Sequence, residues 1–241
     1  MSDANQITAV SNREVLREAF FLYFKERLDS ARTQPHKADG MILLMAGLDA
    51  LANHWASSGE VLVEPNNGAN RLRLFLKHHG QHDCFGRVSM PELRKTVEIT
   101  DITKFEKLFP FSSVQAPVTY RSLDWTCDPT FEDLLTIGDI NLGLNAMKSK
   151  VFQRKLIDSS YGGLVYKRFR CAWVHEFLPN LDGVVTSGLL SEDEDAPYYH
   201  YVQTTKRWFL VMSAGFLVRT FEAAIESFKT YAITNNKPLP K

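Results

Sequence analysis

The chain has 241 residues, of which 44% are hydrophobic and 23% are charged, and its 28 basic residues equal its 28 acidic residues. This composition excludes an intrinsically disordered chain and predicts one domain with a substantial core rather than two independent modules. The balanced charge excludes a protein that attracts nucleic acid or anionic membrane through its overall field, so any such contact must come from a local patch.

Three features of the sequence bear on the compartment. Cys84, Cys127 and Cys171 are widely spaced, which is typical of free thiols in a reducing compartment. The first residues show no basic region leading into an apolar stretch, and no Asn-x-Ser/Thr site occurs. The longest apolar stretch, residues 208–218, is far shorter than the roughly 20 residues that cross a bilayer. We therefore expect a cytoplasmic protein with no membrane partner.

The first half of the chain predicts three helices followed by an irregular insertion. Apolar residues recur at helical spacing from Arg13 to Leu28, which predicts an amphipathic helix. The segment from Met41 to Trp55 is so apolar that it predicts a buried central helix, with Asp49 as the lone acid in its middle. Ala69 to His79 predicts a third, basic helix. Prolines interrupt residues 81–145, which predict an insertion of short helices and loops.

The second half predicts a further helix, a hairpin and a last helix. Helical character is clear from Leu164 to Phe177. Two segments rich in β-branched and aromatic residues, Gly183 to Gly188 and Tyr198 to Val202, predict a small β-hairpin. The last predicted helix runs from about Lys206 to Tyr231, and residues 235–241 predict a flexible, polar tail.

The helix from Leu164 carries the residues best suited to chemistry. An imidazole such as that of His175 exchanges a proton near pH 7, and a guanidinium such as that of Arg170 stabilises charge growing on a phosphate. On an α-helix Arg170 lies about 140° around the axis from His175, whereas Arg168 points almost the same way as the histidine. The alternative is structural: the arginine binds a neighbouring carboxylate and the histidine caps the last helical turn.

The string Arg170-Cys171-Ala172-Trp173-Val174-His175 resembles the active-site motif of the HEPN family of helical-bundle proteins. In that family four to six residues separate an arginine from a histidine on a late helix; Arg170 fits this spacing with four residues and Arg168 with six. The apolar segment around Asp49, Gly47 to Ala52, is similar to the second helix of such bundles, where an acid can support the motif.

The resemblance covers residues 13–57 and 160–232, and it implies a mainly α fold. The expected architecture is an up-and-down HEPN-like helical bundle that forms a single domain over residues 1–241. The irregular insertion at about residues 81–145 and the small β-hairpin are additions to this bundle. The insertion matches no segment of the family.

The resemblance also implies a function, namely metal-independent endoribonuclease activity in a toxin or defence effector. The RNA 2′-hydroxyl would attack the adjacent phosphate, with His175 transferring the proton and Arg170 stabilising the phosphate, and with Asp49, Arg168 and Cys171 in support. No metal or cofactor is implied. The expected partners are RNA, a second copy of the chain whose motif faces the first, and an antitoxin or other protein.

Cys171 keeps a second class of function open. It stands where the family usually has Asn, Asp or His, and a thiol is a weaker hydrogen-bond donor than an amide. This substitution favours a non-catalytic HEPN-like module that binds RNA, a nucleotide or a protein. A purely structural dimerisation domain, in which the motif only ties helices together, is the third hypothesis.

A basic run precedes and overlaps the motif. Seven basic residues fall between positions 148 and 170, with Asp158 as the single acid. An ordinary solvated helix face would have the same pattern, and RNA binding is the functional alternative. The candidate RNA-binding residues outside the motif are Lys148, Lys150, Arg154, Lys155 and Lys167.

A second cluster joins five metal-capable side chains between His78 and Cys84. Its residues do not have the spacing of known zinc ligands, and the sequence contains no further group of such residues to complete a site. The cluster therefore predicts histidines at the end of a helix rather than a zinc site.

Overall fold

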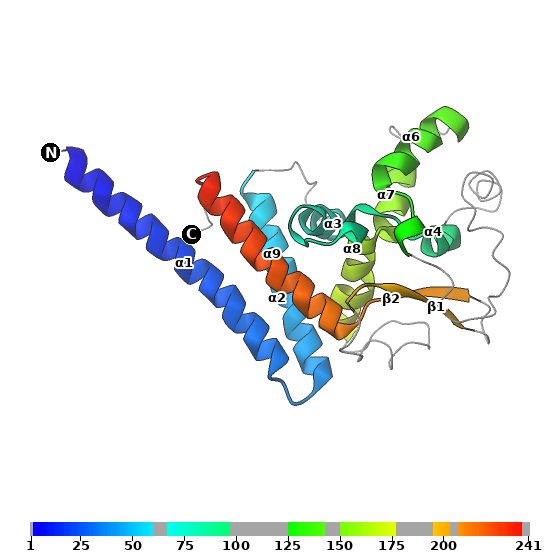
Figure 1. Ribbon diagram of the computed structural model, residues 1–241, viewed down its shortest axis with the longest axis horizontal. Coiled ribbons are helices and arrows are strands. Elements are labelled where there is room, and N and C mark those ends of the chain that lie inside the picture. The colour runs from blue at the N-terminus through cyan, green and yellow to red at the C-terminus, as the bar shows by residue number, and fades with distance from the viewer. Residues whose placement is uncertain are drawn as a thin grey trace.

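The computed structural model is mainly helical and contains a two-stranded antiparallel sheet in its described part (Figure 1). The predicted mainly α fold with a small hairpin is confirmed at this level. None of the described helices combines the length and apolarity that a membrane crossing requires. The structure describes residues 2–59, 67–96, 125–142, 150–176, 195–202 and 207–237.

Three long helices lie side by side on one side of the molecule: α1 (Ser2–Arg32), α2 (Lys37–Ser57) and α9 (Ala214–Thr234) (Figure 1). The predicted first helix thus lies inside a longer one. Phe24 of α1 packs edge-on against Phe221 of α9, with ring centroids 6.5 Å apart. A Cβ atom at Gly47 would lie 2.8 Å from Cζ of Phe221, so glycine is what allows α2 and α9 to approach this closely.

The helix α3 (Gly68–His79) contacts α2, α8 (Tyr161–Leu164) and α9. The Asn67 side chain caps its start by accepting a hydrogen bond from the Asn70 N–H, at 3.1 Å. At its end the Gly80 N–H donates to the Leu76 carbonyl at 2.8 Å. Phe75 and Leu76 point into the main core, where both are fully buried.

Much of the predicted irregular insertion builds a second, smaller core. Its described elements are η1 (Asp83–Gly86), α4 (Met90–Thr96), η3 (Trp125–Cys127) and α6 (Phe131–Leu142). Of these, α4 and α6 bury one apolar cluster together with α7 (Lys150–Ser159) and Ala69 of α3, whereas Cys84 and Phe85 of η1 lie in the main core. Residues 97–124 and 143–149 of the predicted insertion lie outside the described residues. The cluster consists of Ala69, Val88, Leu93, Phe131, Leu134, Phe152, Leu156 and Ile157.

One strand of the predicted hairpin is present, and it pairs with a segment that was predicted as helix. β1 (Tyr198–Val202) pairs with β2 (Arg207–Val211), with Tyr198 opposite Val211. The prediction that helix begins near Lys206 is therefore wrong, because residues 207–211 include Trp208, Phe209 and Val211, which favour a strand. The Ser213 hydroxyl then accepts the Phe216 N–H and starts α9. The predicted partner, residues 183–188, lies outside the described residues.

A buried polar network ties this sheet to the second core. The hydroxyls of Tyr161 and Tyr199 both donate to the Asp128 carboxylate, and the Met90 N–H donates to its other oxygen at 3.3 Å. The Tyr199 hydroxyl also lies 2.8 Å from the Ser89 hydroxyl. Burial raises the pKa of Asp128 to about 6, against the opposing effect of these hydrogen bonds. The network joins segments that are far apart in the sequence.

The C-terminal tail begins with contacts to α1. Arg17, which is buried, donates to the side-chain oxygen of Asn236 at 3.0 Å and to the carbonyl of Lys237 at 3.1 Å. The predicted flexible tail is described only as far as Lys237. These hydrogen bonds attach the first residues of the tail to the middle of α1.

Candidate functional site

The central helix and the motif helix meet at Asp49. The Arg170 Nε donates to one carboxylate oxygen of Asp49 at 3.0 Å, and the Arg71 Nη2 donates to the other at 2.8 Å. These three side chains come from α2, α3 and η4 (Val165–Glu176), and they are largely buried. The structure thus brings together Asp49 and Arg170, which the sequence placed in one site although 121 positions separate them. We call this arrangement the Asp49 site.

Arg71 is a member of the Asp49 site that the sequence did not single out. It lies in the first turn of the predicted basic helix. That helix carries several other basic residues, and the sequence alone does not distinguish Arg71 from them. Two guanidinium groups share one carboxylate, so the three side chains carry one net positive charge. A partly desolvated cluster of this sign suits an anion such as a phosphate.

Tyr166 forms one wall of the Asp49 site. The Arg170 guanidinium carbon lies 5.3 Å from the centre of the Tyr166 ring, in a cation–π contact. The start of α3 lies against the hydroxyl end of the ring, where a Cβ atom at Gly68 would stand 2.3 Å from the Tyr166 hydroxyl oxygen. Only glycine at position 68 therefore lets the ring occupy this place.

Replacing Gly68 with alanine is expected to push Tyr166 off Arg170 and to destabilise the protein by about 1–3 kcal/mol, because the new methyl group overlaps the ring. Gly86→Ala is the matched control, since a Cβ atom there has no neighbour within 4 Å. Urea denaturation of both variants measures the difference. Equal stability of the two variants would contradict the close contact.

Charges around Arg170 set its protonation. Burial alone lowers the pKa of the Arg170 guanidinium, but Asp49, Tyr166 and a hydrogen bond with Cys171 outweigh burial and raise the pKa above its ordinary value. Arg170 therefore stays cationic at every pH at which the fold survives. Cys171 is a free thiol of intermediate exposure beside it. Of the supporting residues expected from the sequence, Asp49 and Cys171 thus lie next to Arg170.

The motif helix is wound differently from the α-helix that the sequence predicts. From Val165 to Glu176 it is a π-helix, whose backbone hydrogen bonds join residues five apart. Positions five apart, such as 170 and 175, are therefore separated by roughly one turn. The angle between them around the helix axis is smaller than the 140° or so expected on an α-helix. The backbone of His175 belongs to this helix, while its side chain lies outside the described residues. π-helical segments occur frequently at functional sites.

The structure does not bring Arg168 to the Asp49 site. Its guanidinium pairs with the buried carboxylate of Glu92 on α4, and it also donates to the Leu210 carbonyl of β2 at 3.4 Å. Glu92 accepts a second cation, Lys95, at 2.9 Å. The two arginines of the motif helix are therefore held by two different acids, and Arg168 fastens the helix to α4.

The basic run is divided between two helices. Lys167 on η4 pairs with Asp158 on α7 at 2.6 Å. Lys150 and Arg154 are exposed on α7, Lys155 is partly exposed, and Lys148 lies outside the described residues. α7 packs against α3, α4 and α8, whereas the Asp49 site lies where α2, α3 and η4 meet.

The His78–Cys84 cluster is spread over structural contacts. His79 is buried, with Nδ1 3.0 Å from the Ser227 hydroxyl, and His82 accepts a hydrogen bond from the Cys84 N–H at 3.3 Å. Burial raises the pKa of the Cys84 thiol well above its ordinary value. Within the described part of the chain, no three His, Cys, Asp or Glu side chains are grouped so that they could hold a metal ion.

The stacking of Tyr166 on Arg170 and the role of Gly68 were not predicted from the sequence. An aromatic residue four positions before an arginine on a helix is a signal for such stacking, but it arises often in ordinary cores. The contact of Gly68 with Tyr166 links segments that are far apart and leaves no local signal.

Comparison with models of protein families, with curated proteins and with solved structures found no match for this chain.

Proposed function

We propose that this protein is a HEPN-type, metal-independent endoribonuclease whose active site is the Asp49 site. The observation that carries the proposal is the ion pair between Asp49 of the central helix and Arg170 of the motif helix. The resemblance to the family assigns a supporting acid to the central helix and the phosphate-binding arginine to the motif helix. The net positive charge that Arg71 and Arg170 leave on one acid supports phosphate as the ligand, because guanidinium groups bind phosphate oxygens well.

In the proposed reaction the RNA 2′-oxygen attacks the adjacent phosphorus. His175 accepts the 2′-hydroxyl proton as the O2′–P bond forms, and a proton is returned to the 5′-oxygen as the P–O5′ bond breaks. The products are a 2′,3′-cyclic phosphate and a 5′-hydroxyl, so neither water nor metal is consumed in this step. Arg170 neutralises the charge that develops on the phosphoryl oxygens, and Asp49 holds its guanidinium in place.

Arg71 has a role in this reaction that the resemblance does not supply. Its Nη2 shares the Asp49 carboxylate with Arg170, so both guanidinium groups are oriented by one acid. It would add a second positive charge next to the phosphate, in the substrate complex and in the transition state alike. Its loss is therefore expected to weaken RNA binding more than the chemical step.

The proposal includes the parts of the resemblance that reach beyond the site. These are an up-and-down HEPN-like bundle, a cytoplasmic location, RNA as substrate, a homodimer, and a toxin or defence role with an antitoxin or other protein partner. The mainly helical fold and the lack of a membrane-spanning helix among the described residues are consistent with them.

Cys171 favours the alternative, a non-catalytic HEPN-like module that binds RNA, a nucleotide or a protein. Its thiol contacts Arg170 in place of the amide or carboxylate usual in the family. Such a module would keep the positive Asp49 site and its affinity for phosphate but would leave RNA intact.

The test is cleavage of labelled single-stranded and structured RNA by the purified chain in excess EDTA. His175→Ala and Arg170→Ala are each expected to lower the rate at least about 100-fold, because one removes the proton-transfer group and the other the phosphate contact. Arg168→Ala is the matched control, since this arginine lies on the same helix but pairs with Glu92. It should retain the rate within a few-fold once corrected for the folded fraction.

RNA that is bound but not cut would favour the binding module. Cleavage that is indifferent to the replacement of Arg170 and His175 would refute the proposed active site.

A further inference from the structure

The ring of Tyr166 is fixed in place by contacts on several sides. It is partly exposed, and it packs against both the main core and the second core. Its hydroxyl end lies against the start of α3, where a Cβ atom at Gly68 would stand 2.4 Å from Cζ of the ring. A side chain packed in this way cannot turn to another rotamer unless α3 or one of the cores moves. The ring is therefore a rigid surface beside Arg170.

The Arg170 guanidinium is held from two directions. The Asp49 carboxylate accepts its Nε at 3.0 Å, and the centre of the Tyr166 ring lies 5.3 Å from its Cζ. Tyr166 and Arg170 stand four positions apart on the motif helix, so their side chains share one face of it. The hydrogen bond at Nε fixes one edge of the guanidinium, and the ring contact restricts the tilt of its plane.

We propose that Tyr166 is a positioning residue, which sets the plane of the Arg170 guanidinium for the phosphate that binds at the Asp49 site. A guanidinium binds phosphate oxygens through N–H groups that lie in one plane, so its tilt matters as much as its distance from the phosphate. The kinetic consequence of this inference rests on the proposed ribonuclease function. The positioning itself has a test that does not depend on cleavage.

The ring of Tyr166, rather than its hydroxyl, has this role. Burial raises the pKa of the Tyr166 hydroxyl above its ordinary value, so the hydroxyl is neutral near pH 7 and supplies no negative charge to Arg170. The attraction for the cation comes from the electron-rich face of the ring, which phenylalanine shares and leucine lacks. The variants Tyr166→Phe and Tyr166→Leu therefore separate the ring contact from the packing of an apolar side chain.

Steady-state cleavage of RNA by the full chain measures the kinetic consequence. Tyr166→Leu should lower kcat about tenfold and change KM less than about threefold, because a tilted guanidinium still attracts the substrate phosphate but no longer fits the transition state. Tyr166→Phe should keep both constants within about threefold of the wild type, because the ring remains. A wild-type kcat per folded molecule in Tyr166→Leu, or an equal loss in Tyr166→Phe, overturns the proposal.

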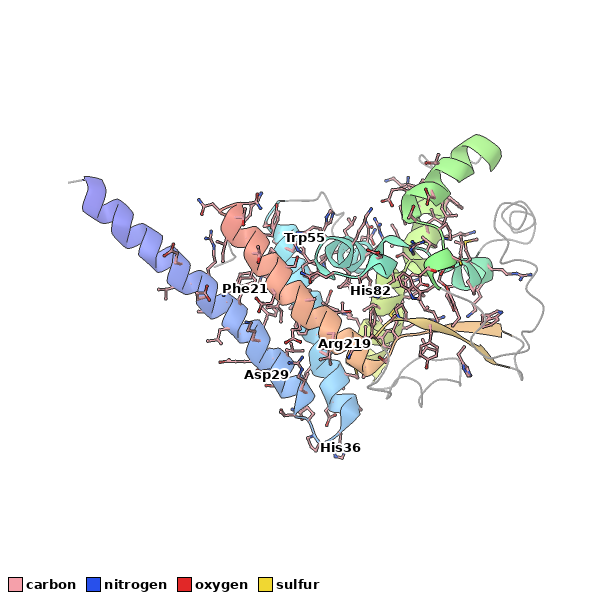
Figure 2. The ribbon with its side chains drawn as sticks, in the orientation of Figure 1. Phe21, Asp29, His36, Trp55, His82 and Arg219 are labelled. Carbon is pink, nitrogen blue, oxygen red and sulfur yellow. The ribbon has the colours of Figure 1, made fainter. Side chains whose placement is uncertain are left out.

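Tyr231→Leu is the matched control for lost packing. Tyr231 is also partly exposed and packs on the main core, and its ring contacts His79, the last residue of α3. Tyr166 contacts Gly68, the first residue of α3, which lies about 16 Å away along the helix axis. Figure 2 shows Trp55, another ring that contacts His79, near the C-terminal ends of α2 and α9. The control should lose stability but keep its kcat per folded molecule.

Proton–nitrogen NMR of the Arg170 Nε–Hε group tests the positioning directly. Its signal is assigned by its absence in Arg170→Ala, and the neighbouring ring displaces it from the position of a solvated arginine. Tyr166→Leu should move the signal toward that position, whereas Tyr166→Phe should leave it displaced. If the wild type cuts RNA and the signal is unchanged in Tyr166→Leu, the positioning alone is overturned. If the signal responds but the wild type cuts no RNA, the ribonuclease is refuted and the positioning of Arg170 is supported.

Discussion

Asp49→Ala is expected to lower the free energy of unfolding by about 2–3 kcal/mol and the rate of RNA cleavage at least about tenfold. The change leaves Arg71 and Arg170 without their shared carboxylate in a largely buried place, where like charges repel. The Arg170 guanidinium would then lose the acid that holds its Nε. Urea denaturation and the EDTA cleavage assay measure the two effects on the same preparation.

Glu92→Ala is the matched control for this change. Glu92 also binds two cations, Lys95 and Arg168, and one of them lies on the same motif helix as Arg170. The control should lose a comparable amount of stability but keep its cleavage rate per folded molecule. If both variants lose cleavage equally, Asp49 acts only through the stability of the motif helix and has no role in positioning Arg170.

Asp128→Asn is expected to remove a dependence of stability on pH that amounts to about 3 kcal/mol. The pKa of Asp128 is about 6 in the fold, where burial raises it from its ordinary 3.8. Between these two values the native state holds the proton and the unfolded state releases it, so the free energy of unfolding falls as the pH rises from about 4 to about 6. Above about pH 6 Asp128 is ionised in both states, so it no longer changes the free energy of unfolding with pH.

The measurement is urea denaturation of the wild type and of Asp128→Asn from pH 4 to pH 7.5. The stability of the wild type relative to the variant should decrease across this range, whereas histidine protonation affects both proteins alike and cancels in the difference. A constant difference would mean that Asp128 titrates near its ordinary pKa and that the network with Tyr161 and Tyr199 does not desolvate it.

The sequence predicted those parts of the fold that depend on local patterns. The distribution of apolar residues located the first three helices. The strand Arg207–Val211 was predicted as helix, because a short apolar run fits a buried helix and a buried strand equally well until its partner is known. Its partner β1 was predicted as a strand from its aromatic and β-branched residues, but the sequence predicted another segment, residues 183–188, to pair with it.

The candidate site was predicted in part. Asp49 and Arg170 were found because the resemblance gave each of them a role, and the structure joins them in an ion pair. Arg71 and Glu92 were missed, because the choice of partner for a guanidinium depends on tertiary contacts that no local spacing encodes. The π-helical winding was missed as well, since the sequence from Val165 to Glu176 has the same apolar rhythm that an α-helix would show.

The most direct measurement of the proposed chemistry uses an RNA oligonucleotide that the wild type cuts, and a second copy with one 2′-deoxy nucleotide immediately before the scissile phosphate. Attack by the 2′-hydroxyl predicts that cutting stops at that phosphate alone, and that the unmodified RNA yields a 2′,3′-cyclic phosphate end. Continued cutting at the modified position, or no cutting of the unmodified RNA, would contradict a HEPN-type ribonuclease at the Asp49 site.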